Sequence, residues 1–357
     1  MKFDFFKEVT PPLVGVDISS SAVKMVEITQ TGRDAYRLEG YAIAPLPKDA
    51  VVDGNIMQLD QVAEAVKRAW KLLGTREKRA ALALPSAAVI TKKVIMAAGM
   101  REEDMEIQVE AEANQYIPFS LDEVNIDFQE IGPSANNPEE VEVLIAASRK
   151  EKIEDRVAAA EGAGLKVNVM DVETYATDKA YMLARNQLPN RGKGQTVMII
   201  DIGAIMMHIN VLHNNESIYT REQNFGGSQL TQEIQRRFGL SAEEAEIAKR
   251  KGGLPSSYDA EVLQPFVQSL ILEISRALQF FTSSTQYNRV DHILLAGGCS
   301  AIQSLDVLVQ ERTQVNTVVM NPFSIMELNP RIKQQQIAMD APALIIACGL
   351  AMRRFDA

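Results

Sequence analysis

The chain has 357 residues, 46% hydrophobic and 24% charged, which is typical of a globular protein and excludes a disordered or collagen-like chain. Its 47 acidic residues outnumber 37 lysines and arginines, and the formal net charge of -10 without a long basic run argues against nucleic-acid binding. The longest apolar runs, such as 341–352, are short for a membrane span, and with no signal-peptide pattern and only two cysteines we expect a cytoplasmic protein.

The first predicted unit is a strand, a tight turn and two further strands. An apolar run from residue 13 ends at Asp17, and three serines follow it: Ser19, Ser20 and Ser21. A second strand is predicted over 23–28, a turn at Thr31-Gly32, and a third strand over 36–44. This unit therefore predicts an antiparallel meander that opens with a hydroxyl-rich turn.

The same plan returns half a chain later, over residues 197–222. An apolar strand ends at Asp201, small residues follow, Asn214-Asn215 form a turn, and a returning strand is predicted over 217–222. Asp17 and Asp201 therefore occupy equivalent places in two halves. An internal duplication is the simplest explanation, and it predicts a two-lobed protein.

Helices are predicted between these strands. Apolar residues at helical spacing indicate helices over 61–73, 102–116, 150–163, 228–238 and 263–282, and Ser241 begins a capping box for another helix. An apolar strand over 292–296 precedes Gly297-Gly298. This alternation of strands and helices favours an α/β fold.

The residues at the strand ends suit a nucleoside triphosphate. Phosphates bind to backbone N–H groups in tight turns of small residues, and Mg²⁺ prefers carboxylates and water. The turns after Asp17 and Asp201 and the Gly297-Gly298 pair offer both features, and Lys24 could reach a phosphate as a point charge. We therefore predict a magnesium–nucleotide site between the two halves.

These residues resemble the actin-like ATPase superfamily. Its two phosphate hairpins would be 14–28 and 199–211, its adenosine motif 293–300 (ILLAGGCS), and its connecting helices would begin near 171–174 and 341–349. The resemblance implies a fold of duplicated ribonuclease H-like halves that binds ATP and Mg²⁺, with Asp17 and Asp201 as the metal carboxylates. The implied nucleotide residues are Asp17, Ser19, Ser20, Ser21, Lys24, Asp201, Gly203, Gly226, Gly227, Lys249, Gly297 and Gly298.

A closer resemblance is to the PilM family of type IV pilus assembly proteins, which are similar to the cell-division protein FtsA. It rests on residues 110–119 (EAEANQYIPF), 142–149 (EVLIAASR), 164–167 (GLKV) and 225–231 (FGGSQLT). It implies an FtsA-like extra subdomain over 86–165. The first lobe would then comprise 1–85, 166–195 and 336–357, and the second lobe 196–335.

The PilM resemblance implies an ATP-binding scaffold at the cytoplasmic face of the inner membrane. It would bind the N-terminal cytoplasmic tail of PilN, couple the membrane platform to cytoplasmic components, and so serve twitching motility. Pilus motor ATPases and other copies of this chain are further candidate partners. The alternatives are an FtsA-like filament-forming, membrane-associated protein and a small-molecule kinase of the same superfamily.

The two phosphate turns depart from the superfamily pattern, and we therefore expect slow or absent ATP hydrolysis. Ser19 stands where glycine is usual, and 205–207 (IMM) stand where hydroxyl residues are common.

Glu173 is the candidate catalytic acid that orients water, although an acid at a helix N-terminus can also be only a cap. His208 is either a general base or a structural histidine, depending on the face of the strand on which it lies. Lys249 either covers the adenine or forms an ordinary ion pair with Glu246.

A partner surface is predicted in the extra subdomain. The segment after its acidic helix could form groove walls for an extended peptide: Tyr116, Ile117, Pro118 and Phe119. The alternative is that Ile117 and Phe119 anchor the subdomain core. On the helix itself, Glu103, Glu106 and Glu110 would steer a basic tail toward the groove.

Overall fold

The computed structural model describes residues 11–134 and 137–356, so residues 1–10 and 357 of the expected first lobe and 135–136 of the extra subdomain lie outside the described residues. A first sheet has the strand order β10-β6-β1-β2-β3-β16. Its strands are β1 (Val14–Ile18), β2 (Ala22–Gly32), β3 (Ala35–Pro45), β6 (Arg79–Leu84), β10 (Lys166–Val172) and β16 (Glu327–Leu328). β1, β2 and β3 form an antiparallel meander, whereas β6 runs parallel to β1 and β10 parallel to β6.

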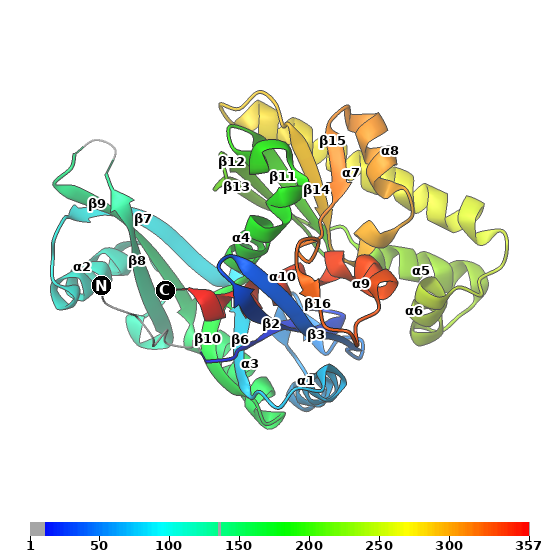
Figure 1. Ribbon diagram of the computed structural model, residues 1–357, viewed down its shortest axis with the longest axis horizontal. Coiled ribbons are helices and arrows are strands. Elements are labelled where there is room, and N and C mark those ends of the chain that lie inside the picture. Colours follow the sequence, from blue (N-terminus) through cyan, green and yellow to red (C-terminus); the bar gives the residue numbers. More distant parts are fainter. Residues whose placement is uncertain (1–10, 135–136, 357) are drawn as a thin grey trace.

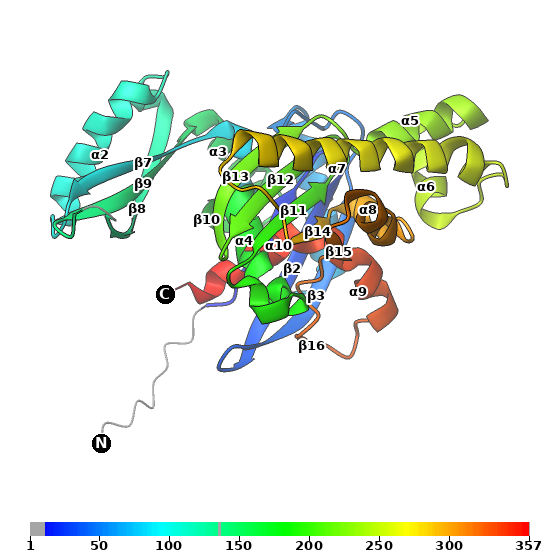
Figure 2. The ribbon, with the colours of Figure 1, turned by 90° about the horizontal axis from the view of Figure 1, so that it is seen from above.

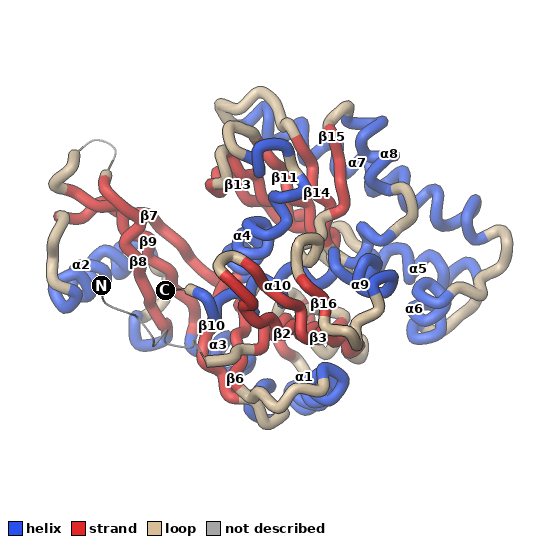
Figure 3. The backbone as a smooth tube through the Cα atoms, viewed as in Figure 1, coloured by secondary structure: helices blue, strands red, loops and turns tan. Residues whose placement is uncertain are grey.

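A second sheet repeats this arrangement, with the order β13-β12-β11-β14-β15. Its strands are β11 (Thr196–Ile202), β12 (Met207–His213), β13 (Glu216–Gln223), β14 (His292–Ala296) and β15 (Asn316–Val319). Again an antiparallel meander is followed by two parallel strands. The expected duplication and two-lobed α/β fold are therefore confirmed, and the two sheets are visible as separate red layers in Figure 3.

The equivalence of the two hairpins extends to single residues. In the first hairpin Asp17 lies opposite Lys24, and in the second Asp201 lies opposite His208. Directly opposed residues of an antiparallel pair point to the same face of the sheet. Each lobe therefore presents a carboxylate and a basic side chain together, at the same position of its hairpin.

Helices cover both faces of each sheet. α1 (Leu59–Leu73) and α3 (Lys150–Gly162) pack on the outer face of the first sheet, and α7 (Gln264–Ser284) runs along the outer face of the second (Figures 1 and 2). α4 (Glu173–Ala184) and α10 (Ile345–Met352) lie between the sheets, in a core that includes Val26, Ala180, Val197 and Ile345. The second lobe also carries α5 (Gly227–Phe238), α6 (Ala242–Lys251) and α8 (Leu305–Thr313).

The extra subdomain projects from the first lobe, at the left of Figure 1. The 3-10 turn η1 (Ser86–Ala88) leads into a three-stranded sheet of order β7-β9-β8, from β7 (Val89–Ala97), β8 (Val124–Pro133) and β9 (Glu140–Arg149). α2 (Glu102–Tyr116) covers one face of this sheet by packing Met105 and Val109 against Val143 and Ile145. The helix expected over 102–116 is confirmed as α2.

Two features near the C-terminal end differ from the sequence analysis. β16 pairs with β3 on the first sheet, although residues 196–335 were expected in the second lobe. The helical stretch 334–355, which includes α9 (Gln334–Asp340) and α10, is the one stretch of the described chain long and apolar enough to cross a membrane. However, 61% of its most apolar window is buried inside the protein, as in a core helix.

Candidate functional site

Asp17 and Lys24 form the first-lobe half of the candidate site. Asp17 is the penultimate residue of β1 and is only 2% exposed, and the Lys24 Nζ lies 2.8 Å from its Oδ2. Burial opposes the charge of Lys24, but the ion pair with Asp17 and the more distant carboxylates of Asp201 and Glu173 raise its pKa. The charges of carboxylates from both lobes therefore contribute to the raised pKa of Lys24.

Asp201 and Glu173 bring further acids to the same place. Burial raises the pKa of Asp201, against the opposing effects of His208 and Lys24. Glu173 is the first residue of α4, and burial and the Asp17 charge raise its pKa to about 7. The place between the two hairpins where Asp17, Lys24, Glu173, Asp201 and His208 interact is called the cleft, and its three carboxylates favour a bound cation.

His208 faces these carboxylates, so the structure decides the alternative that the sequence left open about its orientation. Its Nδ1 lies 3.5 Å from the Glu222 Oε1 on β13. Burial opposes its charge, but the Glu222 hydrogen bond and the charges of Asp201 and Glu173 raise its pKa to about 9. His208 is therefore a cation at neutral pH.

The two turns engage the backbone amide at the same position and leave the amides after it free. The Ser19 amide and hydroxyl both donate to the Ala22 carbonyl, at 3.1 and 2.9 Å, and the Gly203 amide donates to the Met206 carbonyl at 3.0 Å. Both Ser19 donors are thus engaged inside the turn. Within the described ranges, five other turn amides donate to no backbone carbonyl: those of Ser20, Ser21, Ala204, Ile205 and Met206. The free amides of each turn can donate to an anion such as a phosphate group.

Glycines allow three segments of the second lobe to approach one another closely. Gly297 has a φ of +83°, and a side chain there would begin 2.4 Å from the Asp201 Oδ1. A Cβ on Gly226 would lie 2.5 Å from the Ala204 carbonyl oxygen, and the Gly227 amide donates to the Gly203 carbonyl. The expected glycines therefore surround the second turn, while Gly298 borders open space.

Lys249 on α6 lies beside Gly227, one of these glycines. Its Nζ lies 2.6 Å from the Glu246 Oε2, donates to the Thr231 Oγ1 at 2.8 Å, and lies 3.4 Å from the Gly227 carbonyl oxygen. The expected ion pair with Glu246 is therefore present, and it holds the Lys249 ammonium group beside Gly227, the first residue of α5. Cys299 also lies here, with its Sγ 3.7 Å from the Gly203 carbonyl oxygen. Cys299 was not among the residues expected at the site, although its place inside the adenosine motif pointed to it.

The donors in the cleft fit a magnesium–nucleotide complex better than a metal held by protein alone. Among the residues that the structure describes, no three His, Cys, Asp or Glu side chains gather to hold a metal ion. Magnesium commonly uses one or two carboxylates, several waters and the substrate phosphates. Asp17 and Asp201 could supply the carboxylates, Lys24 and His208 positive charge, and the turn amides donors for phosphate.

Arg156 is a buried cation whose charge acts on Glu173 and Asp17, and it was not found from the sequence. It is 1% exposed, and it donates from Nε to the Ala83 carbonyl at 3.0 Å and from Nη2 to the Gly54 carbonyl at 2.8 Å. Burial lowers its pKa, whereas Glu173 and Asp17 act in the opposite direction. An arginine on an amphipathic helix gives no sequence signal of such a position.

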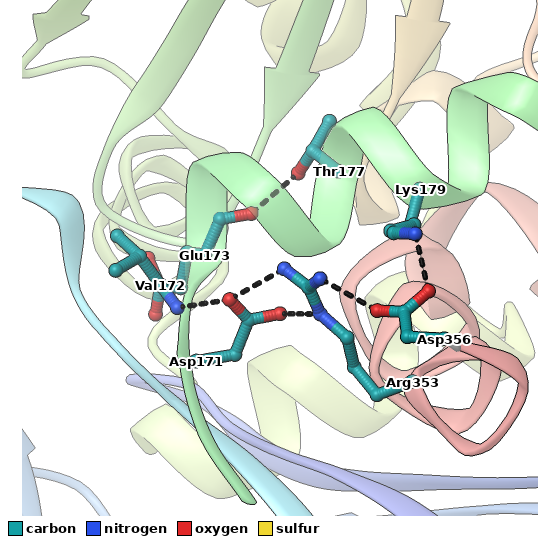
Figure 4. A network of polar contacts seen from close by, with 7 residues as sticks. All are labelled: Asp171, Val172, Glu173, Thr177, Lys179, Arg353 and Asp356. Atoms are coloured by element: carbon teal, nitrogen blue, oxygen red, sulfur yellow. Dashed lines mark hydrogen bonds and ion pairs between the residues drawn. The ribbon is translucent and has the colours of Figure 1, made fainter. Parts of the chain in front are cut away.

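A second polar network secures the start of α4 (Figure 4). Arg353 binds both carboxylate oxygens of Asp171, with Nη2 2.8 Å from Oδ1, and the same Oδ1 accepts the Val172 amide. Arg353 also pairs with Asp356, which in turn binds Lys179 on α4. The C-terminal segment thus clamps the strand and helix that flank Glu173.

The expected partner residues separate into buried and exposed groups. Ile117 is 7% exposed and packs with Val124 and Ala147, so it anchors the subdomain core. Phe119 is 41% exposed, with the Arg149 guanidinium 5.4 Å from its ring centre, and Pro118 is also exposed. The Lys92 Nζ lies 4.1 Å from the Tyr116 ring centre. The acids on the outer face of α2 are all exposed: Glu103, Glu106 and Glu110.

The chain is similar to several known proteins over nearly its whole length. A chain of a PilM-PilN type IV pilus biogenesis complex matches with a TM-score of 0.78 and 28% identity, covering 97% of this chain and 99% of that one. The ethanolamine utilization protein EutJ from Carboxydothermus hydrogenoformans shares the fold, with a TM-score of 0.56, 16% identity, and 96% and 89% of the two chains covered. The cell division protein FtsA of Bacillus subtilis (strain 168) is 22% identical, over 89% of this chain and 80% of FtsA.

A family model described as type IV pilus assembly protein PilM matches residues 15–355. The matched residues include the two hairpin turns that follow Asp17 and Asp201, the extra subdomain and the Gly297-Gly298 segment. The chain therefore belongs to the PilM family of type IV pilus assembly proteins, with a two-lobed actin-like fold.

Proposed function

We propose that this protein is an ATP-binding scaffold of type IV pilus assembly that captures the N-terminal cytoplasmic tail of PilN. One observation carries the nucleotide part of the proposal. The paired hairpins bring Asp17, Lys24, Asp201 and His208 into one cleft, beside turn amides with no backbone acceptor. Carboxylates, cations and free amides are the groups that a magnesium–nucleotide complex requires.

ATP acts in this proposal mainly as a structural ligand. Phosphoryl transfer needs a positioned water as well as metal and phosphate contacts. The second turn carries Ile205, Met206 and Met207 and so offers no hydroxyl group to the phosphates. Water positioning falls to Glu173 or His208, so hydrolysis is slow or absent. A ligand bound only to the closed arrangement of the lobes stabilises it by mass action, without turnover.

The partner part of the proposal rests on the relative whose structure is a PilM-PilN complex and on the extra subdomain. An extended tail gains affinity from backbone hydrogen bonds and from pockets for alternate side chains. Phe119 and Pro118 are exposed beside the acidic helix α2, and they are the proposed contact residues together with Tyr116. The protein itself would be cytoplasmic, held at the inner face of the inner membrane through PilN.

Calorimetry with Mg-ATP tests the nucleotide site. Asp201→Ala should weaken binding at least about tenfold, which is 1.4 kcal/mol. Glu311→Ala, which removes an exposed acid of α8, is the matched control and should bind as the unmodified protein does. Unchanged Mg-ATP binding in both Asp17→Ala and Asp201→Ala would refute the site.

A synthetic peptide of the N-terminal segment of the cognate PilN tests the scaffold role. The peptide should bind the unmodified protein and bind Asp201→Ala more weakly, because that variant loses the closed arrangement of the lobes. A turnover near one ATP per second that depends on Glu173 would instead identify an enzyme.

A further inference from the structure

The first turn of α4 lies where the cleft and the extra subdomain meet. The chain leaves the first sheet at the end of β6, enters the extra subdomain through η1 and β7, and returns through α3 and β10 directly into α4. Figure 2 shows β7 running from the body of the protein out into the extra subdomain. The start of α4 is therefore adjacent both to the cleft and to the root of the subdomain.

Three consecutive residues of this turn contact three different places. Glu173 faces the cleft, where Asp17, His208 and Asp201 act on its charge. The Thr174 Oγ1 lies 2.5 Å from the Ser86 Oγ, in the turn that opens the extra subdomain. The side chain of Thr91 on β7 is close enough to act on the Tyr175 hydroxyl, where it opposes the rise that burial causes in the pKa of Tyr175.

The contacted segments are continuous with the sheet of the extra subdomain. The Ser148 hydroxyl of β9 donates to the Ala88 carbonyl of η1 at 2.8 Å. β7 pairs with β9 along its whole length, from Val89 opposite Ser148 to Ala97 opposite Glu140. A shift of Ser86 or Thr91 would therefore move the sheet rather than a loose loop.

The first half of α4 is held by two ion pairs to the C-terminal segment. The Asp171–Arg353 pair fixes the chain just before α4, and Lys179, in the middle of α4, is tied to Asp356. A closing cleft would therefore displace the whole first turn rather than the Glu173 side chain alone. Packed interfaces respond to such small shifts by changing between discrete arrangements.

We propose that Thr174 and Tyr175 couple the nucleotide cleft to the extra subdomain. Mg-nucleotide in the cleft sets the position of the first turn of α4, and the contacts with Ser86 and Thr91 pass that position to β7. The inference rests on the proposed function for the identity of the two ligands. Coupling between two binding sites is reciprocal, so a peptide on the subdomain must change nucleotide affinity by the same factor.

Hydrogen exchange of the β7 amides tests the link without any partner. In the unmodified full chain, Mg-ATP should slow exchange over residues 89–97, whereas the Thr174→Val/Tyr175→Phe double variant should bind Mg-ATP and lose that effect. Thr282→Val is the control, because the Thr282 hydroxyl bonds only within α7 among the contacts described, and it should respond normally. The inference is overturned if Mg-ATP does not change the exchange of the β7 amides in the unmodified protein, or if Mg-ATP still slows that exchange in the double variant.

A binding cycle with the PilN peptide separates this inference from the proposed function. The unmodified protein should bind the peptide about fivefold or more tightly with Mg-ATP than without it. The double variant should keep both separate affinities and lose this ratio. If both ligands bind the unmodified protein but Mg-ATP does not change its affinity for the peptide, the coupling is refuted and the scaffold role stands. If the unmodified protein binds neither ligand, the proposed function fails and the coupling fails with it.

Discussion

Replacing Glu173 with glutamine should stabilise the nucleotide-free protein, and more strongly as the pH rises. Burial and the Asp17 charge raise the pKa of Glu173 from 4.5 to about 7. Below about pH 4.5 the carboxyl is protonated in both folded and unfolded chains and makes no difference. Between these values the unfolded chain ionises first, so the folded protein loses stability as the pH rises. Glutamine keeps the shape of the side chain and removes this dependence.

The size of the effect follows from the two pKa values. At 1.36 kcal/mol per pKa unit, the rise from 4.5 to about 7 corresponds to at most ~3.4 kcal/mol above pH 7. Glu173 is partly exposed, so water screens its charge, and about 2 kcal/mol is the reasonable expectation. For a chain of 357 residues this raises the melting temperature by about 3 °C.

Thermal unfolding of the unmodified and Glu173→Gln proteins at pH 5 and pH 8, without nucleotide, measures this difference. We expect a clear gain at pH 8 and a much smaller one at pH 5. Asp306→Asn on α8, outside the cleft, controls for general effects of removing a carboxylate. A gain equal at both pH values, or a loss at pH 8, would refute the electrostatic account of the cleft.

Two further predictions concern the C-terminal clamp and the acidic helix. Arg353→Ala leaves the buried Asp171 carboxylate without its two-point partner and should cost about 2 kcal/mol in urea unfolding, whereas Arg331→Ala, on an exposed arginine, should cost almost nothing. An equal effect in both variants would show that the clamp is not stabilising. Reversing the charge of Glu103, Glu106 and Glu110 should slow association of the PilN peptide, and the association rate of the unmodified protein should fall as salt rises. An association rate that does not change with salt would exclude steering by α2.

The sequence alone determined the class of fold and the places of the strand ends. Apolar periodicity predicted α1, α2, α5 and α7 within two residues of their observed bounds, and β14 at its observed bounds. The repetition of an apolar strand, an acid and a small turn predicted the duplication. These features are local, because the spacing of apolar residues, the turn residues and the strand ends are each set by residues that are close together in the chain.

The tertiary structure decided which residues meet. Whether His208 faces the cleft depends on the register of β11 with β12, and no single strand contains that information. The burial of Arg156, the return of β16 to the first sheet, and the Ser86–Thr174 contact all join residues that are far apart in the chain. The same holds for Ile117, which packs with Val124 and Ala147 rather than lining a groove. Such contacts result from packing between elements, so a local pattern can name the candidate residues but cannot select their partners.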